Sequence, residues 1–284
     1  MRLTVDNLAE VRQSMTDAAV DEVGAGPPLR SVTDVDADGV PARLYTAGPD
    51  DAPVLLYAHG GGWVMGDLAT HDGLCRHLAA ATGWAVLAVD YRRAPEHPWP
   101  APADDVERAL GWLRRRGVAV AVAGDSAGAH LAAVVAARAR AVGHPVHAQV
   151  LICPALDPEM AYPDLDDYGL HRDEMRFFWD AVAPPGVDRA DPGFDPMRAD
   201  PAGAPPTVVI TAEFDVLRDE GERYAARLQA VDVPVVCARY QGVNHNFVRK
   251  LALFDAAHAA VAQIAAVLSI WLRSAPGRPP PDNR

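Results

Sequence analysis

The sequence is poor in cysteine and has none of the cysteine patterns that staple small proteins or bind metals. Its 284 residues include three cysteines, Cys75, Cys153 and Cys237, each in apolar surroundings and none in CxxC spacing. This pattern is typical of reduced core thiols in a cytoplasmic protein and disfavours a disulfide or zinc framework. His71 and His77 lie in a helical stretch without an HExxH pattern, so we expect no metal site.

Three further features are missing, and each excludes a class of protein. No run of about 18 apolar residues free of charge occurs, so we expect no membrane helix. The first residues, MRLTVDNLAEVRQSMTD, lack the continuous apolar stretch of a signal peptide. Basic residues are outnumbered, because 26 lysines and arginines face 38 aspartates and glutamates, for a formal net charge of −12. Such a balance argues against nucleic acid or an anionic membrane as a partner.

The sequence does contain a regular alternation of strand and helix patterns. Helical patterns separate most of six short apolar runs: 54–58, 84–90, 118–123, 148–153, 207–211 and 235–239. Residues 29–48 predict two further strands joined by a turn at Asp38 and Gly39. Strands buried on both faces that alternate with helices predict an α/β fold, with a mostly parallel sheet covered on both sides.

One long segment interrupts this alternation. Residues 157–206 are rich in proline and aspartate and contain the cluster MRFFWDAV. A long insertion between two strands is usually functional, for example as a lid. We expect an N-terminal cap segment at 1–28, a core at 29–156 and 207–274, a cap insertion at 157–206 and a flexible tail at 275–284.

The most informative motif is Gly124-Asp125-Ser126-Ala127-Gly128, which lies between an apolar run and an alanine-rich helical pattern. A GxSxG sequence between a strand and a helix predicts a nucleophile elbow. Its sharp turn exposes the serine at the carboxyl end of the sheet, where the helix N-terminus favours developing negative charge. The alternative is an ordinary strand-to-helix turn with a serine N-cap. The flanking strand and helix favour the catalytic interpretation.

A serine nucleophile needs a histidine base. In folds with a nucleophile elbow, the histidine follows the serine in the chain. The candidates among the histidines that follow the serine are His144, His147, His171, His245 and His258. The first two are too close in sequence to reach back over the sheet, the third lies in the insertion, and the last lies inside the final helix. His245 follows the last predicted strand in a loop with glycine and asparagine, so we expect His245 to be the base.

The acid of the triad is expected between Ser126 and His245, just after a strand. The stretch PTVVITAEFDVLRDEG offers four candidates: Glu213, Asp215, Asp219 and Glu220. The last two fall inside the following helix, where acidic residues are favourable in the first turns. Asp215 comes directly after the strand and is our prediction for the acid, with Glu213 as a rival that spacing alone does not eliminate.

An oxyanion hole is predicted at His59-Gly60-Gly61-Gly62, which follows a strand. Glycines let backbone N–H groups approach a substrate oxygen, and HGGG is the oxyanion element of lipases and esterases. The N–H of Ala127, the residue after the nucleophile, is the usual third donor. His59 precedes the serine, so we expect a structural role for it.

Taken together, these motifs resemble the bacterial esterase branch of the hormone-sensitive-lipase family of α/β-hydrolases. The motifs occur in the same order as in that family, from about residue 40 to 250. They are HGGGWVMGD, VDYRRAPEHPWPAPADD, GDSAGAHLA, DEMRFFWD, PTVVITAEFDVLRDEG and YQGVNHNF. The resemblance implies a triad of Ser126, Asp215 and His245, with oxyanion donors from Gly61, Gly62 and Ala127. It also implies a cap made of the N-terminal helices and the insertion. Three positions depart from the family: Arg93 replaces leucine, and Ala129 and Asn246 replace glycine.

Aromatic residues near these motifs favour an apolar acyl group in the substrate. We expect substrate contacts from Trp63, Phe214 and Phe247 in the catalytic loops and from Phe178 in the cap insertion. An equal alternative for the cap aromatic cluster is that it holds the cap on the core.

We therefore expect a serine carboxylesterase for small-molecule esters, with acyl groups of roughly two to eight carbons and no cofactor. An amidase or deacetylase with the same triad is the main alternative, and a non-catalytic ligand-binding module is another. The family that the chain resembles often dimerises through its last strand, here near 235–239, so a homodimer remains an alternative to a monomer.

Overall fold

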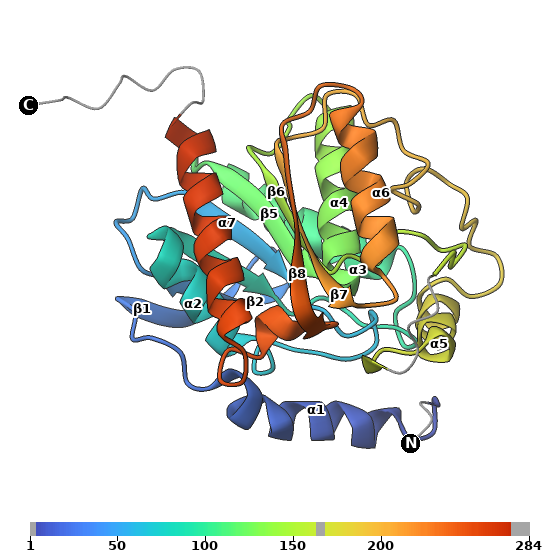
Figure 1. Cartoon of the computed structure of the whole chain (residues 1–284). Coiled ribbons are helices and arrows are strands. Elements are labelled where there is room, and N and C mark those ends of the chain that lie inside the picture. The colour runs from blue at the N-terminus through green and yellow to red at the C-terminus, as the bar shows by residue number, and fades with distance from the viewer. Residues whose placement is uncertain (1–3, 163–167, 274–284) are drawn as a thin grey trace, which may run out of the picture.

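The computed structural model describes residues 4–162 and 168–273, and it contains one eight-stranded sheet (Figure 1). Its strands are β1 (Ser31–Asp36), β2 (Pro41–Thr46), β3 (Val54–Ala58), β4 (Ala85–Val89), β5 (Val120–Asp125), β6 (Gln149–Ile152), β7 (Thr207–Phe214) and β8 (Val235–Asn244). They are ordered β1-β2-β4-β3-β5-β6-β7-β8. β2 pairs antiparallel with both β1 and β4, and the other neighbouring strands are parallel. The predicted mostly parallel sheet is confirmed.

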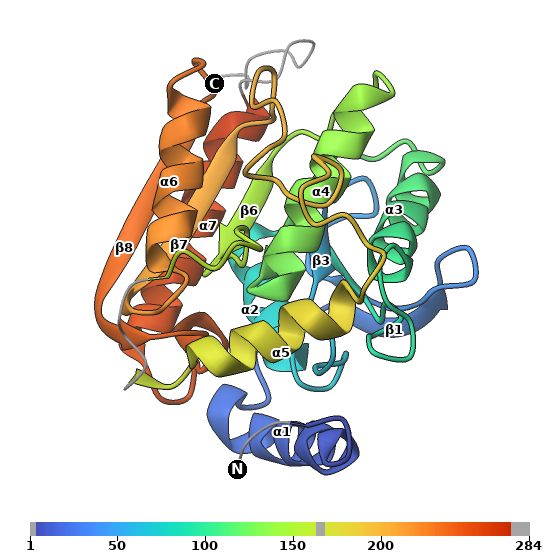
Figure 2. The same ribbon diagram turned by 90° about the vertical axis from the view of Figure 1, so that its right-hand side faces the viewer.

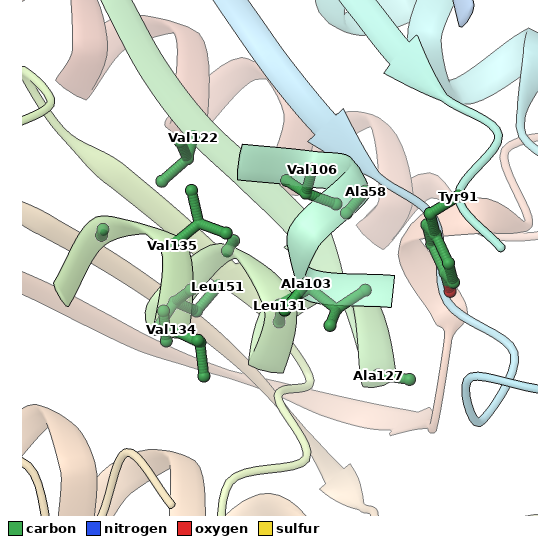
Figure 3. Close-up of a cluster of buried hydrophobic side chains, with 14 of the residues drawn as sticks. Ala58, Tyr91, Ala103, Val106, Val122, Ala127, Leu131, Val134, Val135 and Leu151 are labelled. Carbon is green, nitrogen blue, oxygen red and sulfur yellow. The ribbon is translucent and has the colours of Figure 1, made fainter. Parts of the chain in front are cut away.

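Helices cover both faces of the sheet (Figures 1 and 2). One face carries α2 (Asp72–Thr82) and α7 (Asp255–Arg273), and the other carries α3 (Ala101–Arg114), α4 (Ala127–Ala141) and α6 (Arg218–Gln229). Each face has its own cluster of buried hydrophobic side chains. Figure 3 shows part of the α3 and α4 cluster, with Val135 of α4 beside Val122 of β5 and Leu131 of α4 beside Ala103 of α3. The small side chains of the alanine-rich α4 allow this helix to pack closely on the sheet.

Three strands extend further than the apolar runs predicted. β5 ends at Asp125 rather than 123, β7 at Phe214 rather than 211, and β8 at Asn244 rather than 239. The end of β8 was missed because β8 is an edge strand, in which partly buried and exposed residues alternate without a continuous apolar run. These extensions place Ser126, Asp215 and His245 directly after a strand end, at the edge where the parallel strands finish.

Two helices outside the sheet layers lie beyond that edge. They are α1 (Leu8–Val23) and α5 (Arg172–Val182), and Figures 1 and 2 show both beyond the ends of β7 and β8. The division into core and cap stays a prediction, and the predicted tail at 275–284 lies outside the described residues. Within 4–162 and 168–273, no helix has the length and apolar character needed to cross a membrane.

Candidate active site

Ser126 lies on a strained turn between β5 and α4. Its backbone has φ 53° and ψ −119°, a conformation that residues with a side chain rarely adopt. Its N–H donates to Ile152 O at 2.8 Å, which ties the turn to β6. Gly128 is required here, because a Cβ at this position would overlap the carbonyl oxygen of Ala58 in β3. The local sequence therefore fixes the serine in the geometry of an elbow.

The three residues predicted as a triad lie within hydrogen-bond distance of one another. His245 Nε2 lies 3.0 Å from Ser126 Oγ, and His245 Nδ1 lies 2.7 Å from Asp215 Oδ2. The other oxygen of Asp215 accepts the N–H of Leu217 at 2.9 Å. The Asp215 side chain is fully buried and that of His245 is 8% exposed. A neutral imidazole with its proton on Nδ1 presents its Nε2 lone pair to the serine hydroxyl.

Glu213, the rival for the acid, has a different partner. Its Oε2 accepts the N–H of Gly242 at 2.7 Å, near the end of β8. The carboxylate of Glu213 therefore binds backbone of the edge strand, whereas the His245 imidazole is bonded to Asp215.

The glycine loop after β3 lies beside this serine. Gly61 and Gly62 both have positive φ values, 116° and 61°, which glycine adopts readily. The Gly61 carbonyl accepts the N–H groups of Val64 and Met65, which closes the loop into a tight turn. Within the described residues, the N–H groups of Gly61, Gly62 and Ala127 have no hydrogen-bond partner. These donors remain available for a substrate oxygen, as an oxyanion hole requires.

A buried carboxylate that the sequence analysis did not assign joins the glycine loop to the elbow. Asp125 Oδ1 accepts the Gly60 N–H at 2.9 Å and the Tyr57 hydroxyl at 2.6 Å, and His71 Nε2 lies 3.3 Å from Oδ2. Burial alone would raise the pKa of Asp125, but the interactions with His71 and Tyr57 hold that pKa well below its usual value. Its position inside GDSAG is the only sequence signal for this role.

His59 is part of the support of the same loop. Its ring stacks on Tyr91 with centroids 4.2 Å apart, and the Tyr91 hydroxyl donates to His59 O at 2.8 Å. Burial lowers the pKa of His59 to about 3, so the ring is neutral at ordinary pH. This arrangement agrees with the structural role expected for His59.

A pocket of about 280 Å³, open to solvent, lies over the serine and the histidine. Its apolar wall comes mainly from the two helices beyond the strand ends, through Met15 of α1, Leu170 just before α5, and Phe178 of α5, with Met65 from the glycine loop. Polar groups form the remaining wall: Glu174, Asn244, Asn246, Arg249 and Lys250. The α5 aromatic ring lies directly against the glycine loop, because a Cβ on Gly62 would overlap the Phe178 ring.

Of the four aromatic residues predicted to contact substrate, only Phe178 lines this pocket. Trp63 and Phe247 are fully buried, so their prediction as substrate contacts was wrong. The Trp63 ring packs against Trp179 at 4.4 Å between centroids, and the Phe247 ring against Tyr240 at 5.1 Å. Both residues neighbour site residues in sequence, but their side chains point into the core.

Phe214 also lies outside the pocket lining, but it is only partly buried, so its contact with substrate stays a prediction. Its ring is stacked on Tyr168, with centroids 4.4 Å apart.

Two of the three departures from the family pattern, Arg93 and Asn246, have simple explanations. Arg93 points away from the pocket and donates from Nη1 to Gly66 O at 2.6 Å, which holds the far end of the glycine loop. Asn246 has φ 60°, the left-handed conformation that asparagine tolerates better than most residues with a side chain. Asn246 lines the pocket, so a polar side chain lies where the family has a glycine without one.

A serine on a strand-to-helix turn, with histidine and aspartate after later strands of a mostly parallel sheet, defines the α/β-hydrolase class. Comparison with known proteins leads to the same class. A family model described as alpha/beta hydrolase fold matches residues 55–249, and the chain belongs to this family. Its relatives belong to the hormone-sensitive-lipase-like branch of bacterial esterases, as the sequence motifs predicted.

Similar proteins match over most of their length. Esterase LipI of Mycobacterium tuberculosis is 40% identical over 87% of this chain and 83% of its own. Ethyl acetate hydrolase of Pseudomonas putida is 35% identical over 84% of this chain and 80% of its own. The solved structure of a hyperthermophilic esterase from Pyrobaculum calidifontis has a TM-score of 0.87, with 38% identity over 93% of this chain and 94% of that chain.

Proposed function

We propose that this protein is a serine carboxylesterase that hydrolyses small-molecule esters, with Ser126 as nucleophile, His245 as general base and Asp215 as the orienting acid. The observation that carries the proposal is the hydrogen-bonded series from Ser126 Oγ through both ring nitrogens of His245 to Asp215, at 3.0 and 2.7 Å. The similarity to proteins named esterase, carboxylesterase and ethyl acetate hydrolase supports an ester as the substrate.

The mechanism follows from these positions. Ser126 Oγ attacks the ester carbonyl while His245 Nε2 takes the hydroxyl proton, and Asp215 stabilises the imidazolium that forms. The N–H groups of Gly61, Gly62 and Ala127 bind the oxyanion, and one such donor is worth roughly 3 kcal/mol in related systems. His245 then protonates the leaving alcohol, and a water activated by the same histidine hydrolyses the acyl-enzyme.

The pocket favours short to medium acyl chains of roughly two to eight carbons. Met15 and Phe178 of the cap helices bound its apolar wall, so the space for an acyl chain is finite. Each added methylene should improve kcat/KM by up to about 0.8 kcal/mol until the wall is reached, and longer chains should then lose activity.

Two assays test this function. A fluorophosphonate probe should label wild-type protein at Ser126 and leave the Ser126→Ala variant unlabelled, whereas a non-catalytic binding module would not be labelled at all. A kcat/KM series on p-nitrophenyl esters, beside matched anilides, should favour esters with an optimum within the short to medium range. A preference for the anilides would identify an amidase instead, and an optimum at long emulsified chains would identify a lipase.

The cytoplasmic location and the homodimer remain predictions. For the dimer, the supporting feature is that β8 is an edge strand of the sheet. Pairing of two β8 strands would complete the hydrogen bonds of that edge. Size-exclusion chromatography with light scattering would measure the oligomeric state.

A further inference from the structure

A cysteine that the proposed mechanism does not use lies against the acid and base of the triad. Cys153 directly follows β6, and its N–H donates to Ile210 O at 2.7 Å, which fixes it at the end of the sheet beside β7. One ligand atom each from Cys153, Asp215 and His245 lie within 4.8 Å of one another. Across residues 4–162 and 168–273, no other set of three or more histidine, cysteine or carboxylate groups converges in this way.

The three groups supply a complete set of zinc-type donors. A thiolate sulfur, an imidazole nitrogen and a carboxylate oxygen are the ligands that Zn²⁺ prefers, and softer ions such as Cd²⁺ favour the sulfur still more. In a tetrahedral site with bonds of about 2.0–2.3 Å, neighbouring ligand atoms are about 3.3–3.8 Å apart. Small side-chain movements would bring the ligand atoms of Cys153, Asp215 and His245 to these separations. A water molecule would take the fourth coordination position of the ion.

We propose that Cys153, Asp215 and His245 form an inhibitory binding site for a thiophilic divalent cation such as Cd²⁺ or Zn²⁺. The nitrogen that faces the carboxylate is His245 Nδ1, at 2.7 Å from Asp215 Oδ2, so an ion held by the carboxylate meets Nδ1. An ion at this position replaces the hydrogen bond that orients the imidazole.

The proton balance explains why binding inhibits. Without metal, burial raises the pKa of the Cys153 thiol well above its usual value, and the Asp215 carboxylate raises it further. The thiol is therefore protonated and releases one proton to solvent when its sulfur binds the ion. The proton on His245 Nδ1 moves to Nε2, because Nδ1 now donates its lone pair to the metal. His245 Nε2 then carries a hydrogen and no longer accepts the proton of Ser126.

Access to the site runs through the substrate pocket. His245 lines that pocket and keeps 8% of its side chain exposed, whereas Cys153 and Asp215 are buried behind it. Inhibition should therefore develop slowly and be delayed by a bound substrate analogue.

The test is a Cd²⁺ titration of ester hydrolysis by the full chain, with each variant normalised to its own metal-free rate. Wild type should be inhibited at a Cd²⁺ concentration at least tenfold lower than the Cys153→Ala variant, and EDTA should restore its activity. The matched control is Cys237→Ser, which changes an exposed cysteine and should titrate like wild type. Equal sensitivity of wild type and Cys153→Ala would overturn the proposal, as would loss of sensitivity in Cys237→Ser.

A second measurement does not depend on activity. Cd²⁺ added to the Ser126→Ala variant should produce the ultraviolet absorption of a cadmium–thiolate bond, at one equivalent, and the added substitution Cys153→Ser should abolish it. Serine is nearly isosteric with cysteine, so this variant serves even if alanine at 153 prevents folding. The inhibition, but not the binding, rests on the proposed role of His245. A band that persists without Cys153 would refute the site, whereas a specific band in a protein without esterase activity would refute only the proposed function.

Discussion

The sheet edge that carries the proposed triad and the proposed cap, helices α1 and α5, are held together in different ways. At the edge, Ser126, Asp215 and His245 each follow a strand end, and the backbone of the parallel sheet sets their separation. The cap is held by side chains from segments far apart in sequence. Arg12 of α1 is an example, since its Nε donates to Val64 O at 2.6 Å and its guanidinium pairs with Glu96.

The other end of α1 is tied in the same manner. Glu22 pairs with Arg249 at 2.7 Å, and Arg249 follows the histidine loop. One cap helix thus reaches both the glycine loop and the histidine loop. On the proposed assignment, the edge positions the reacting atoms, whereas the cap shapes the pocket and steadies the loops. Substitutions at the edge should therefore cost far more activity than those in the cap.

The largest effect is expected at the nucleophile. Ser126→Ala should lower kcat by up to about 10⁶-fold, because no other group supplies the attacking oxygen. The far-ultraviolet circular dichroism and the melting temperature should stay near those of wild type. Ser14→Ala, an exposed serine of α1, is the matched control and should keep full activity. Retention of more than a few per cent of activity by Ser126→Ala would mean that another residue is the nucleophile.

The next largest effect should separate the acid from its rival. Asp215→Asn should lower kcat by about 10⁴-fold, because an amide favours the wrong imidazole tautomer. Glu213→Gln should change it little, since Glu213 bonds the backbone of Gly242. Steady-state kinetics on one ester suffice, and equal losses in the two variants would contradict the assignment.

The contact between the glycine loop and the Phe178 ring of α5 can be tested by substitution of Gly62. Gly62→Ala should lower kcat by about a hundredfold, because the loop must shift and displace an oxyanion donor. A Cβ there would overlap the Phe178 ring, and φ of 61° adds backbone strain. Adding Phe178→Ala should restore part of the loss by removing the overlap. If the double variant is no better than Gly62→Ala alone, the cap does not constrain this loop.

A smaller effect concerns stability at the junction of α4 with the segment after α5. His130 Nε2 lies 2.7 Å from Phe194 O, and burial lowers the pKa of His130 to about 4. Below its ordinary pKa of about 6.5 the unfolded chain takes up a proton that the folded chain excludes. The free energy of unfolding should therefore fall by up to about 3 kcal/mol as the pH drops from about 6.5 to 4.

Urea unfolding at several pH values measures this slope. His130→Gln removes the titrating group and retains an N–H donor, so its stability should depend less on pH across the same window. The buried His59 also titrates in this direction, so some slope should remain. An unchanged slope in His130→Gln would show that His130 does not contribute.

The smallest effect is expected for the α1 attachment. Arg12→Ala should lower kcat/KM by several-fold, because it removes the bonds to Val64 O and Glu96 without touching the triad. The loss should appear mainly as a higher KM. Arg30→Ala, which breaks the exposed pair with Asp50, is the matched control and should be neutral. A loss as large as that of Asp215→Asn would erase the distinction between edge and cap.

The sequence predicted the sheet, the insertion and the elbow because each depends on local patterns. Apolar runs separated by helical spacing give a parallel sheet, and glycines around Ser126 permit the strained turn. It did not predict the role of Asp125, whose partner Gly60 lies 65 residues away in the chain. The position of Asp125 inside GDSAG does not indicate which distant N–H its carboxylate accepts.

Local residue types define which residues can form the elbow, the glycine loop and the histidine loop, because the backbone conformation of a turn depends on the residues in it. The strand order and the directions of the side chains are set by tertiary packing. It turned Glu213 toward Gly242, buried Trp63 and Phe247, and brought Cys153 against the triad. The physical reason is that packing between strands and helices distant in sequence selects one rotamer and one partner for each side chain, and no local pattern records that choice.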